Sequence, residues 1–200
     1  MTASGIRWLP KVLVLGLFLL PVLLISPKTY VTLTVSGVAM GMLLFLVSSG
    51  FSLIFGFLSV LNLAHGALFA WGAYIGFTAF SAINQWTGWG TANSVILNLA
   101  IFLLALLAAG LFVSLLGMVT ERLVIRPVYG SHLFQIFITV GAMIVLEETI
   151  RIVWGPDDAV MPVPLSFLGS WDLFDVVVAK YPLIAIAMGL VLYLGISSHP

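Results

Sequence analysis

The sequence contains no cysteine, which excludes disulfide frameworks, thiolate metal sites and cysteine nucleophiles. Charge is also scarce: charged side chains make up 7% of the 200 residues, whereas an average soluble domain is about one quarter charged. The formal net charge of zero leaves no basic patch to neutralise phosphates, so a nucleic-acid partner is not expected. Seven acids and seven bases cannot cover the surface of a water-soluble protein of this length.

Apolar residues dominate instead, and they occur in long runs. They form 62% of the chain, with a mean hydropathy of +1.24. The runs lack the alternating pattern of an outer-membrane barrel, and about 20 apolar residues suffice to cross a bilayer as a helix. The sequence therefore predicts an all-α, polytopic bundle of transmembrane helices, with residues 1–200 forming a single membrane domain of about six spans.

The runs and the polar segments between them give an expected topology. The expected spans are 12–25, 31–57, 60–80, 95–119, 133–153 and 176–196. The first run could also be a signal peptide, but it lacks a small-residue cleavage site and is followed by Pro27, which favours a helix. Two segments are polar: 119–132, where a bend is expected, and 154–175, which is rich in aspartate and tryptophan.

The distribution of lysine and arginine predicts the orientation. The amino-terminal segment carries Arg7 and Lys11, and the 119–132 segment carries Arg122 and Arg126. Placing both segments in the cytoplasm leaves fewer bases outside. We therefore expect a cytoplasmic amino terminus, a cytoplasmic loop at 119–132 and an outer segment at 154–175.

Two polar residues, Asn62 and His65, interrupt the third run in the motif "NLAHG". An unsatisfied polar group in hydrocarbon costs several kcal/mol, and polar residues inside a membrane are expected to be functional. Asn and Gly tolerate the left-handed conformation of an unwound helix, and His65 could bond a freed carbonyl. Alternatively, Asn62 caps the third helix near the cytoplasmic face.

Glycine pairs at small-x-x-x-small spacing occur in two neighbouring runs, where they allow helix backbones to approach closely. The pairs are Gly37 with Gly41 and Gly72 with Gly76. On a helix, the second pair extends to a stripe that consists of Asn62, Gly66, Phe69, Ala73 and Gly76. Packing of the two runs against each other would explain these glycines without any further role.

Glu147, Glu148 and Arg151 are spaced so that they can pair on one helix face. We expect an interfacial ion pair at the end of the fifth span, and a substrate-contact or gating role is the alternative. His65 has no second His or carboxylate at ligand spacing, so no metal site is predicted. The sequence shows no catalytic constellation and no phosphate-binding loop, so an enzyme is not expected.

Three motifs occur together in a characteristic order: "GFSLIFGFLSVLNLAHGALFAWGAY" (50–74), "ERLVIRPVYG" (121–130) and "FITVGAMIVLEETIRIVWGPD" (137–157). In these motifs the chain resembles the permease subunit of ABC-type branched-chain amino-acid importers. The resemblance implies a bacterial inner-membrane protein with a second permease subunit, cytoplasmic ATPase subunits that bind the ATP, and a periplasmic substrate-binding protein. It implies no cofactor in this chain. Urea and short-amide importers share the family.

The resemblance also implies where the transport path lies. The faces around Ser48, Ser49, Asn62, His65 and Gly66 would line it, and the 154–175 segment would be periplasmic and meet the binding protein. The family continues after the sixth span with a basic loop that docks on the ATPase, whereas this sequence ends in Ser-Ser-His-Pro. We expect a permease truncated at its carboxyl end, which could not couple to ATP hydrolysis alone if the native chain ends at Pro200.

Two other functions remain as alternatives. A secondary transporter or channel driven by an ion gradient would need a buried carboxylate or a titrating histidine in the membrane, and only His65 is a candidate. A truncated paralogue that does not transport is the other.

Overall fold

The computed structural model describes residues 23–157, 160, 162–173 and 176–197, together with residues 11, 12, 14, 16 and 19. Half of the expected first span, 12–25, lies outside the described residues. The chain divides into two compact units, one formed by residues 1–43 with 169–200 and the other by residues 44–168.

Within the described residues, three helical segments are long and apolar enough to cross a membrane. They are α2 (Pro27–Leu58), α3 (His65–Thr87), and α4 (Val95–Thr120) together with the short turns that extend it to Val128. The prediction of a helical membrane protein is therefore confirmed. Two further helices are α5 (His132–Trp154) and α6 (Lys180–Ser197). The total of six spans stays a prediction.

The start of α2 lies four residues before the apolar run that predicted it. The Thr29 backbone N–H donates to Oγ of Ser26 at 3.2 Å, and Pro27 occupies the first helical position. A serine cap followed by proline is a strong helix start, because the serine satisfies a free N–H and proline has none to satisfy. Local capping therefore extends the helix beyond its apolar part.

The first unit contains a hairpin and α6, and the hairpin corrects the expected sixth span of 176–196. Its valine-rich beginning is not helical but forms β2 (Val176–Ala179), which pairs antiparallel with β1 (Ser170–Leu173). Valine favours a strand when a partner strand is available, and α6 begins only after it. Within this unit α6 packs closely on α2, because a Cβ at Gly189 would lie 2.8 Å from Sδ of Met42.

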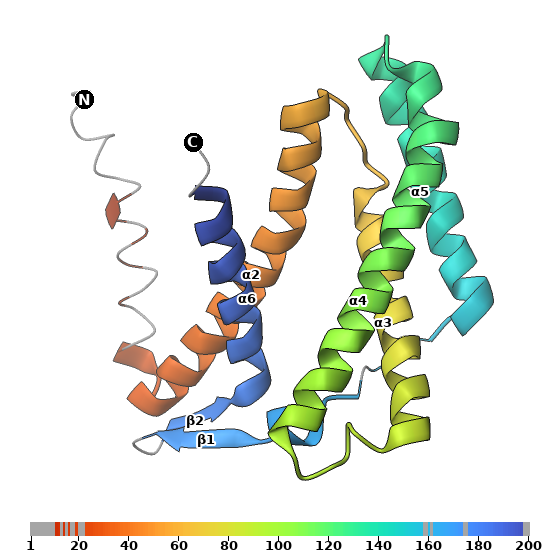
Figure 1. The fold of residues 1–200 in the computed structure, drawn as a ribbon. Coiled ribbons are helices and arrows are strands. Elements are labelled where there is room, and N and C mark those ends of the chain that lie inside the picture. The colour runs from red at the N-terminus through yellow and green to blue at the C-terminus, as the bar shows by residue number, and fades with distance from the viewer. Residues whose placement is uncertain are drawn as a thin grey trace, which may run out of the picture. The chain divides into compact units, whose positions relative to one another are not determined.

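The second unit is built around α3, which packs against both α4 and α5 (Figure 1). Cβ atoms built at Gly72 and Gly76 would lie 3.5 Å from Val113 and 3.7 Å from Ala109, so these glycines face α4. Farther along α3, Phe80 packs in a core with residues of α4. Of the predicted stripe residues that lie on α3, only Gly76 is buried. The buried face consists of Ala67, Leu68, Trp71, Gly76 and Phe80.

The passage from α4 to α5, expected as a loop or bend, consists largely of helical turns. A π-helical turn (Glu121–Ile125) is followed by a 3-10 turn (Arg126–Val128). The wide turn closes where the Arg126 N–H donates to the carbonyl of Glu121. Pro127 follows at once and has no N–H to continue an α-helix, so the chain changes direction there.

Candidate functional site

The α2–α3 connection, residues 59–64, interrupts what composition predicted as the start of a span. α3 begins at His65 and not at Val60. Ser59 ends α2 with a φ of 52°, a left-handed conformation that costs a non-glycine residue roughly 1–2 kcal/mol. Oδ1 of Asn62 then accepts a hydrogen bond from the Ala64 N–H at 3.1 Å. Asn62 therefore forms a local turn that leads into α3, and it does not lie on the helix.

Val60, Asn62 and Ala64 of this connection are buried, so the backbone polar groups around them require partners. Leu61 finds both of its partners on α5. Its N–H donates to Oε1 of Gln135 at 3.3 Å, and its carbonyl accepts from Oγ1 of Thr139, also at 3.3 Å. Gln135 and Thr139 are almost completely buried. Side chains of α5 thus replace the helical hydrogen bonds that Leu61 lacks.

Gln135 also binds the turn that precedes α5. Its Nε2 donates to the carbonyls of Tyr129 at 3.1 Å and Val128 at 3.4 Å, while its Oε1 also accepts from Nδ1 of His132 at 3.3 Å. One amide thereby joins the α2–α3 connection, the 126–130 turn and the first turn of α5. Gln135 and Thr139 were not predicted from the sequence. The signal that could have identified them is a pair of polar residues four positions apart, and therefore on the same helix face, inside an apolar run.

The side chain of His65 turns back onto α2. Its Nε2 lies 3.2 Å from the carbonyl oxygen of Val47, and because a carbonyl only accepts, Nε2 carries the hydrogen. The imidazole passes over Gly50, where a Cβ would approach Nε2 to 2.8 Å. A glycine on α2 therefore makes room for the ring at the beginning of α3.

An open groove of about 310 Å³ lies beside this ring. It is lined by Val47, Ser48, Phe51, Ser52, Leu63, His65 and Gly66. Apolar walls thus alternate with two hydroxyls and an imidazole. This combination can hold a small solute that has both an apolar and a polar part.

The structure brings some of the predicted path residues together and separates others. Ser48, His65 and Gly66 line the groove. Ser49 does not line it, because its hydroxyl donates to the carbonyl of Leu46 within α2. Asn62 lies buried in the connection behind it. Ser52, which the sequence analysis did not name, completes the polar lining.

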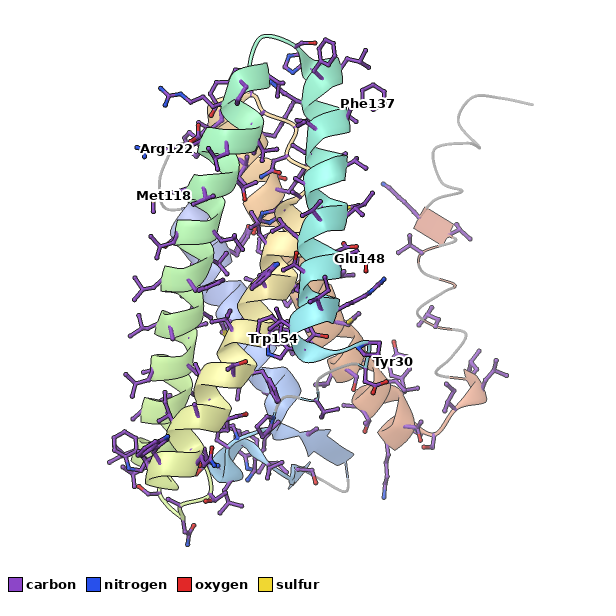
Figure 2. All side chains as sticks on the ribbon, turned by 90° about the vertical axis from the view of Figure 1, so that its right-hand side faces the viewer. Tyr30, Met118, Arg122, Phe137, Glu148 and Trp154 are labelled. Carbon is purple, nitrogen blue, oxygen red and sulfur yellow. The ribbon has the colours of Figure 1, made fainter. Side chains whose placement is uncertain are left out.

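The remaining predicted residues lie elsewhere. Arg151 pairs with Glu148 at 2.7 Å on the exposed side of α5, and both side chains are more than half exposed. Figure 2 shows Glu148 on α5 nearer to Trp154 than to Phe137, away from the end where Arg122 lies. Cβ atoms built at Gly37 and Gly41 would meet nothing within 4 Å.

An aromatic cluster holds α3, α4 and α5 together. Trp71 stacks on Phe112 of α4 with 5.5 Å between ring centroids, and it meets Trp154 of α5 edge-on at the same distance. Its Nε1 donates to the carbonyl of Leu146, and Nε1 of Trp154 donates to Thr78. Trp154 lies between α3 and α5 in Figure 2. α3 and α5 are therefore fixed as parallel neighbours.

Comparison with known proteins identifies the family to which this chain is similar. The family described as "Branched-chain amino acid transport system / permease component" matches residues 33–198. High-affinity branched-chain amino acid transport system permease protein LivH is 28% identical in Salmonella typhimurium over 137 residues and in Escherichia coli K12 over 140 residues, each time covering 68% of this chain and 42% of the relative. BraD, the permease protein so described in Pseudomonas aeruginosa, is 25% identical over 155 residues, covering 76% of this chain and 48% of BraD.

The matched part therefore spans less than half the length of these curated relatives. No solved structure gives a significant match. The chain belongs to the permease family of branched-chain amino-acid transport systems. A member of this family is not an enzyme, and no cofactor is expected of it.

Proposed function

We propose that this chain is a permease subunit of an ABC importer that moves branched-chain or related amino acids into the cytoplasm. The groove beside His65 forms part of the path. The observation that carries this proposal is the groove lined by Ser48, Ser52 and His65 at a break between two apolar helices. A lipid-facing surface would not need hydroxyl and imidazole groups there, since their desolvation costs free energy.

The proposed assembly contains a second permease subunit, cytoplasmic ATPase subunits that bind and hydrolyse ATP, and a periplasmic substrate-binding protein. The chain crosses the bacterial inner membrane several times, with α5 and α6 as further spans and the amino terminus in the cytoplasm. Residues 119–132 lie on the cytoplasmic side and residues 154–175 on the periplasmic side. Ser48, Ser52, His65 and Gly66 face the path, and the Glu148–Arg151 pair lies at the interface.

Cysteine accessibility tests the position of the path, because the chain has no native cysteine. We expect Ser48→Cys and Ser52→Cys to react with a charged, membrane-impermeant thiosulfonate reagent in intact membranes. Leu53→Cys is the matched control: it is exposed on the same helix but does not line the groove. Equal and negligible reaction at all three positions would show that the groove faces lipid and would refute its assignment to the path.

Uptake measurements test the energy source. Cells that express the chain with its partner subunits should still accumulate labelled leucine after the proton gradient is dissipated. Uptake should stop when ATP is depleted. The reverse result would identify an ion-gradient-driven transporter and refute the proposed function. Competition by other apolar amino acids, and by urea and short amides, then defines the substrate class.

A further inference from the structure

The position of the groove depends on a connection in which both backbone polar groups of Leu61 bond to side chains. In α2 and α3 each interior backbone group bonds within its own helix. At Leu61 both the N–H and the carbonyl bond instead to α5, through Gln135 and Thr139. A displacement of the connection along α5 would therefore break few hydrogen bonds, and none of them would belong to a helix.

The hydrogen bonds between Leu61 and these two side chains can also be broken and replaced by others. The two contacts with Leu61 are 3.3 Å long, beyond the usual range of about 3.2 Å for N–H···O and about 3.0 Å for O–H···O hydrogen bonds, so both are weak. The single O–H of Thr139 is shared among three carbonyls: the shortest contact, 2.6 Å, is with Gln135 of its own helix, and those with Leu61 and Ile136 are 3.3 Å. Its hydroxyl can therefore stay bonded when Leu61 moves away. The cost of release falls mainly on the Leu61 backbone, which would need new partners.

Gln135 connects this release to a second segment. Its Nε2 donates to the carbonyls of Val128 and Tyr129, in the turn where α4 passes into α5. One side-chain amide cannot turn toward a displaced 126–130 segment without changing the position of the Oε1 that holds Leu61. A movement of that segment is thus communicated to the residue four positions before His65.

We propose that Gln135 and Thr139, which we term the Leu61 clamp, are positioning residues that hold the α2–α3 connection and thereby place His65 at the groove. Release of the clamp when the 126–130 segment moves changes the shape of the groove. This inference rests on the proposed function for its role in transport, but the clamp itself can be tested without transport.

A cysteine at Val60 reports on the clamp directly. Val60 is 3% exposed and adjoins Leu61, and cysteine is close to valine in size. In the full chain in native membranes, Val60→Cys should react slowly with N-ethylmaleimide. Adding Gln135→Met or Thr139→Val should accelerate the reaction by about tenfold, because each removes a bond to Leu61 without shortening the side chain. Thr139→Ser should restore the slow rate.

Two matched controls separate release of the clamp from general damage. Gln85→Met removes an exposed glutamine of α3, and Thr149→Val removes a hydroxyl that bonds only the Val145 carbonyl of its own helix. Neither should accelerate modification of residue 60. If Gln135→Met does not accumulate in the membrane, the comparison of Thr139→Val with Thr139→Ser decides the matter. Unchanged labelling in Thr139→Val would overturn the clamp.

Transport kinetics provide the second readout. A purely structural defect lowers the maximal uptake rate in proportion to the amount of protein in the membrane. Release of the clamp should instead raise the substrate concentration for half-maximal uptake several-fold in Thr139→Val, with recovery in Thr139→Ser. Failure of wild-type uptake would refute the proposed function while leaving the labelling result valid. Normal half-saturation with unchanged labelling would refute the clamp and leave the function intact.

Discussion

The imidazole of His65 occupies the space above Gly50, where a Cβ would lie 2.8 Å from Nε2 and 2.9 Å from Cε1. This contact fixes how closely the beginning of α3 approaches α2. It also gives one glycine of α2 a specific reason to be glycine. Other glycines of the helix, including Gly56, have open space where a Cβ would stand.

Gly50→Ala should therefore destabilise the protein by about 1–3 kcal/mol, because the new methyl group displaces the ring. Gly56→Ala, on the same helix, should be neutral or stabilising by up to about 1 kcal/mol, since alanine is the better helix former. Thermal unfolding in detergent measures both. In a double-mutant cycle, His65→Ala should remove most of the penalty of Gly50→Ala. Additive effects would contradict the contact.

Trp71 should contribute more to stability than any exposed tryptophan. Trp71→Phe loses the hydrogen bond to the Leu146 carbonyl and weakens the stacking on Phe112, so we expect a loss of about 1–2 kcal/mol. Trp86 is 89% exposed, and Trp86→Phe should change stability by less than about 0.5 kcal/mol. The same unfolding experiment compares the two variants, and equal effects would argue against the aromatic cluster as a structural centre.

Tyr129 should titrate at higher pH than an ordinary tyrosine. Its hydroxyl donates to Oε1 of Glu121 at 2.6 Å, and this hydrogen bond, with a smaller contribution from burial, raises the pKa of Tyr129 above 10.0. The contact favours the protonated phenol, so its contribution to stability is complete below the ordinary pKa and disappears as pH rises through the raised pKa.

The absorbance difference between the wild-type protein and Tyr129→Phe isolates this titration from the other tyrosines. We expect Glu121→Gln to lower the midpoint toward 10.0, because the carboxylate that accepts the hydrogen bond is lost. A midpoint that is the same in the presence and absence of Glu121 would show that the contact is not maintained in the membrane.

Long apolar runs predicted α4 and α5 to within one residue at either end. The runs 95–119 and 133–153 became Val95–Thr120 and His132–Trp154. Apolarity failed at the third run because residues 60–64, which are apolar except for Asn62, are not helical, and Val60, Asn62 and Ala64 are buried. A pair of polar side chains on α5, more than seventy residues away, bonds Leu61 within this connection. No local pattern contains that information.

At the candidate site, too, the sequence predicted some residues correctly and others not. Ser48, His65 and Gly66 were expected on the path, and they do line one groove. Ser49 has the same chemistry as its neighbour but points to its own helix, which a one-residue difference in helical phase explains. Gln135 was not predicted, because it is a neutral amide near the beginning of α5, whereas the charged residues that mark a site in the sequence lie near its end.

Asn98 organises the opposite end of the second unit. Its Nδ2 lies within 3.1 Å of the carbonyls of Trp89, Ala92 and Ser94, and its Oδ1 accepts from the Ser166 N–H. Replacement by leucine removes the side-chain partners of the Trp89 and Ala92 carbonyls and of the Ser166 N–H, while the Ser94 carbonyl keeps its bond from the backbone N–H of residue 98. We expect Asn98→Leu to cost about 3 kcal/mol or more.

Asn98→Leu should also loosen the structure locally. The hydrogen bond to Ser166 holds the turn η3 (Leu165–Phe167) against the connection between α3 and α4. Chymotrypsin should therefore cleave at Leu165 or Phe167 faster in Asn98→Leu than in wild type. Asn93 is exposed in the same loop, so Asn93→Leu is the matched control and should leave cleavage unchanged. Equal protection in both variants would mean that other contacts hold the turn.

His65 distinguishes a hydrogen-bonding role from a proton-carrying role. In His65→Gln the amide can still donate to the Val47 carbonyl, whereas in His65→Leu that carbonyl loses its contact with the ring. If the ring only positions the beginning of α3, His65→Gln should retain most uptake and His65→Leu should lose most of it. The pH profile of uptake should then be the same in wild type and in His65→Gln. A proton-coupled carrier would behave differently. Because glutamine cannot bind and release a proton, uptake by the His65→Gln variant would become independent of pH. Leucine uptake measured between pH 5.5 and pH 8, roughly the range over which a histidine titrates, separates the two mechanisms.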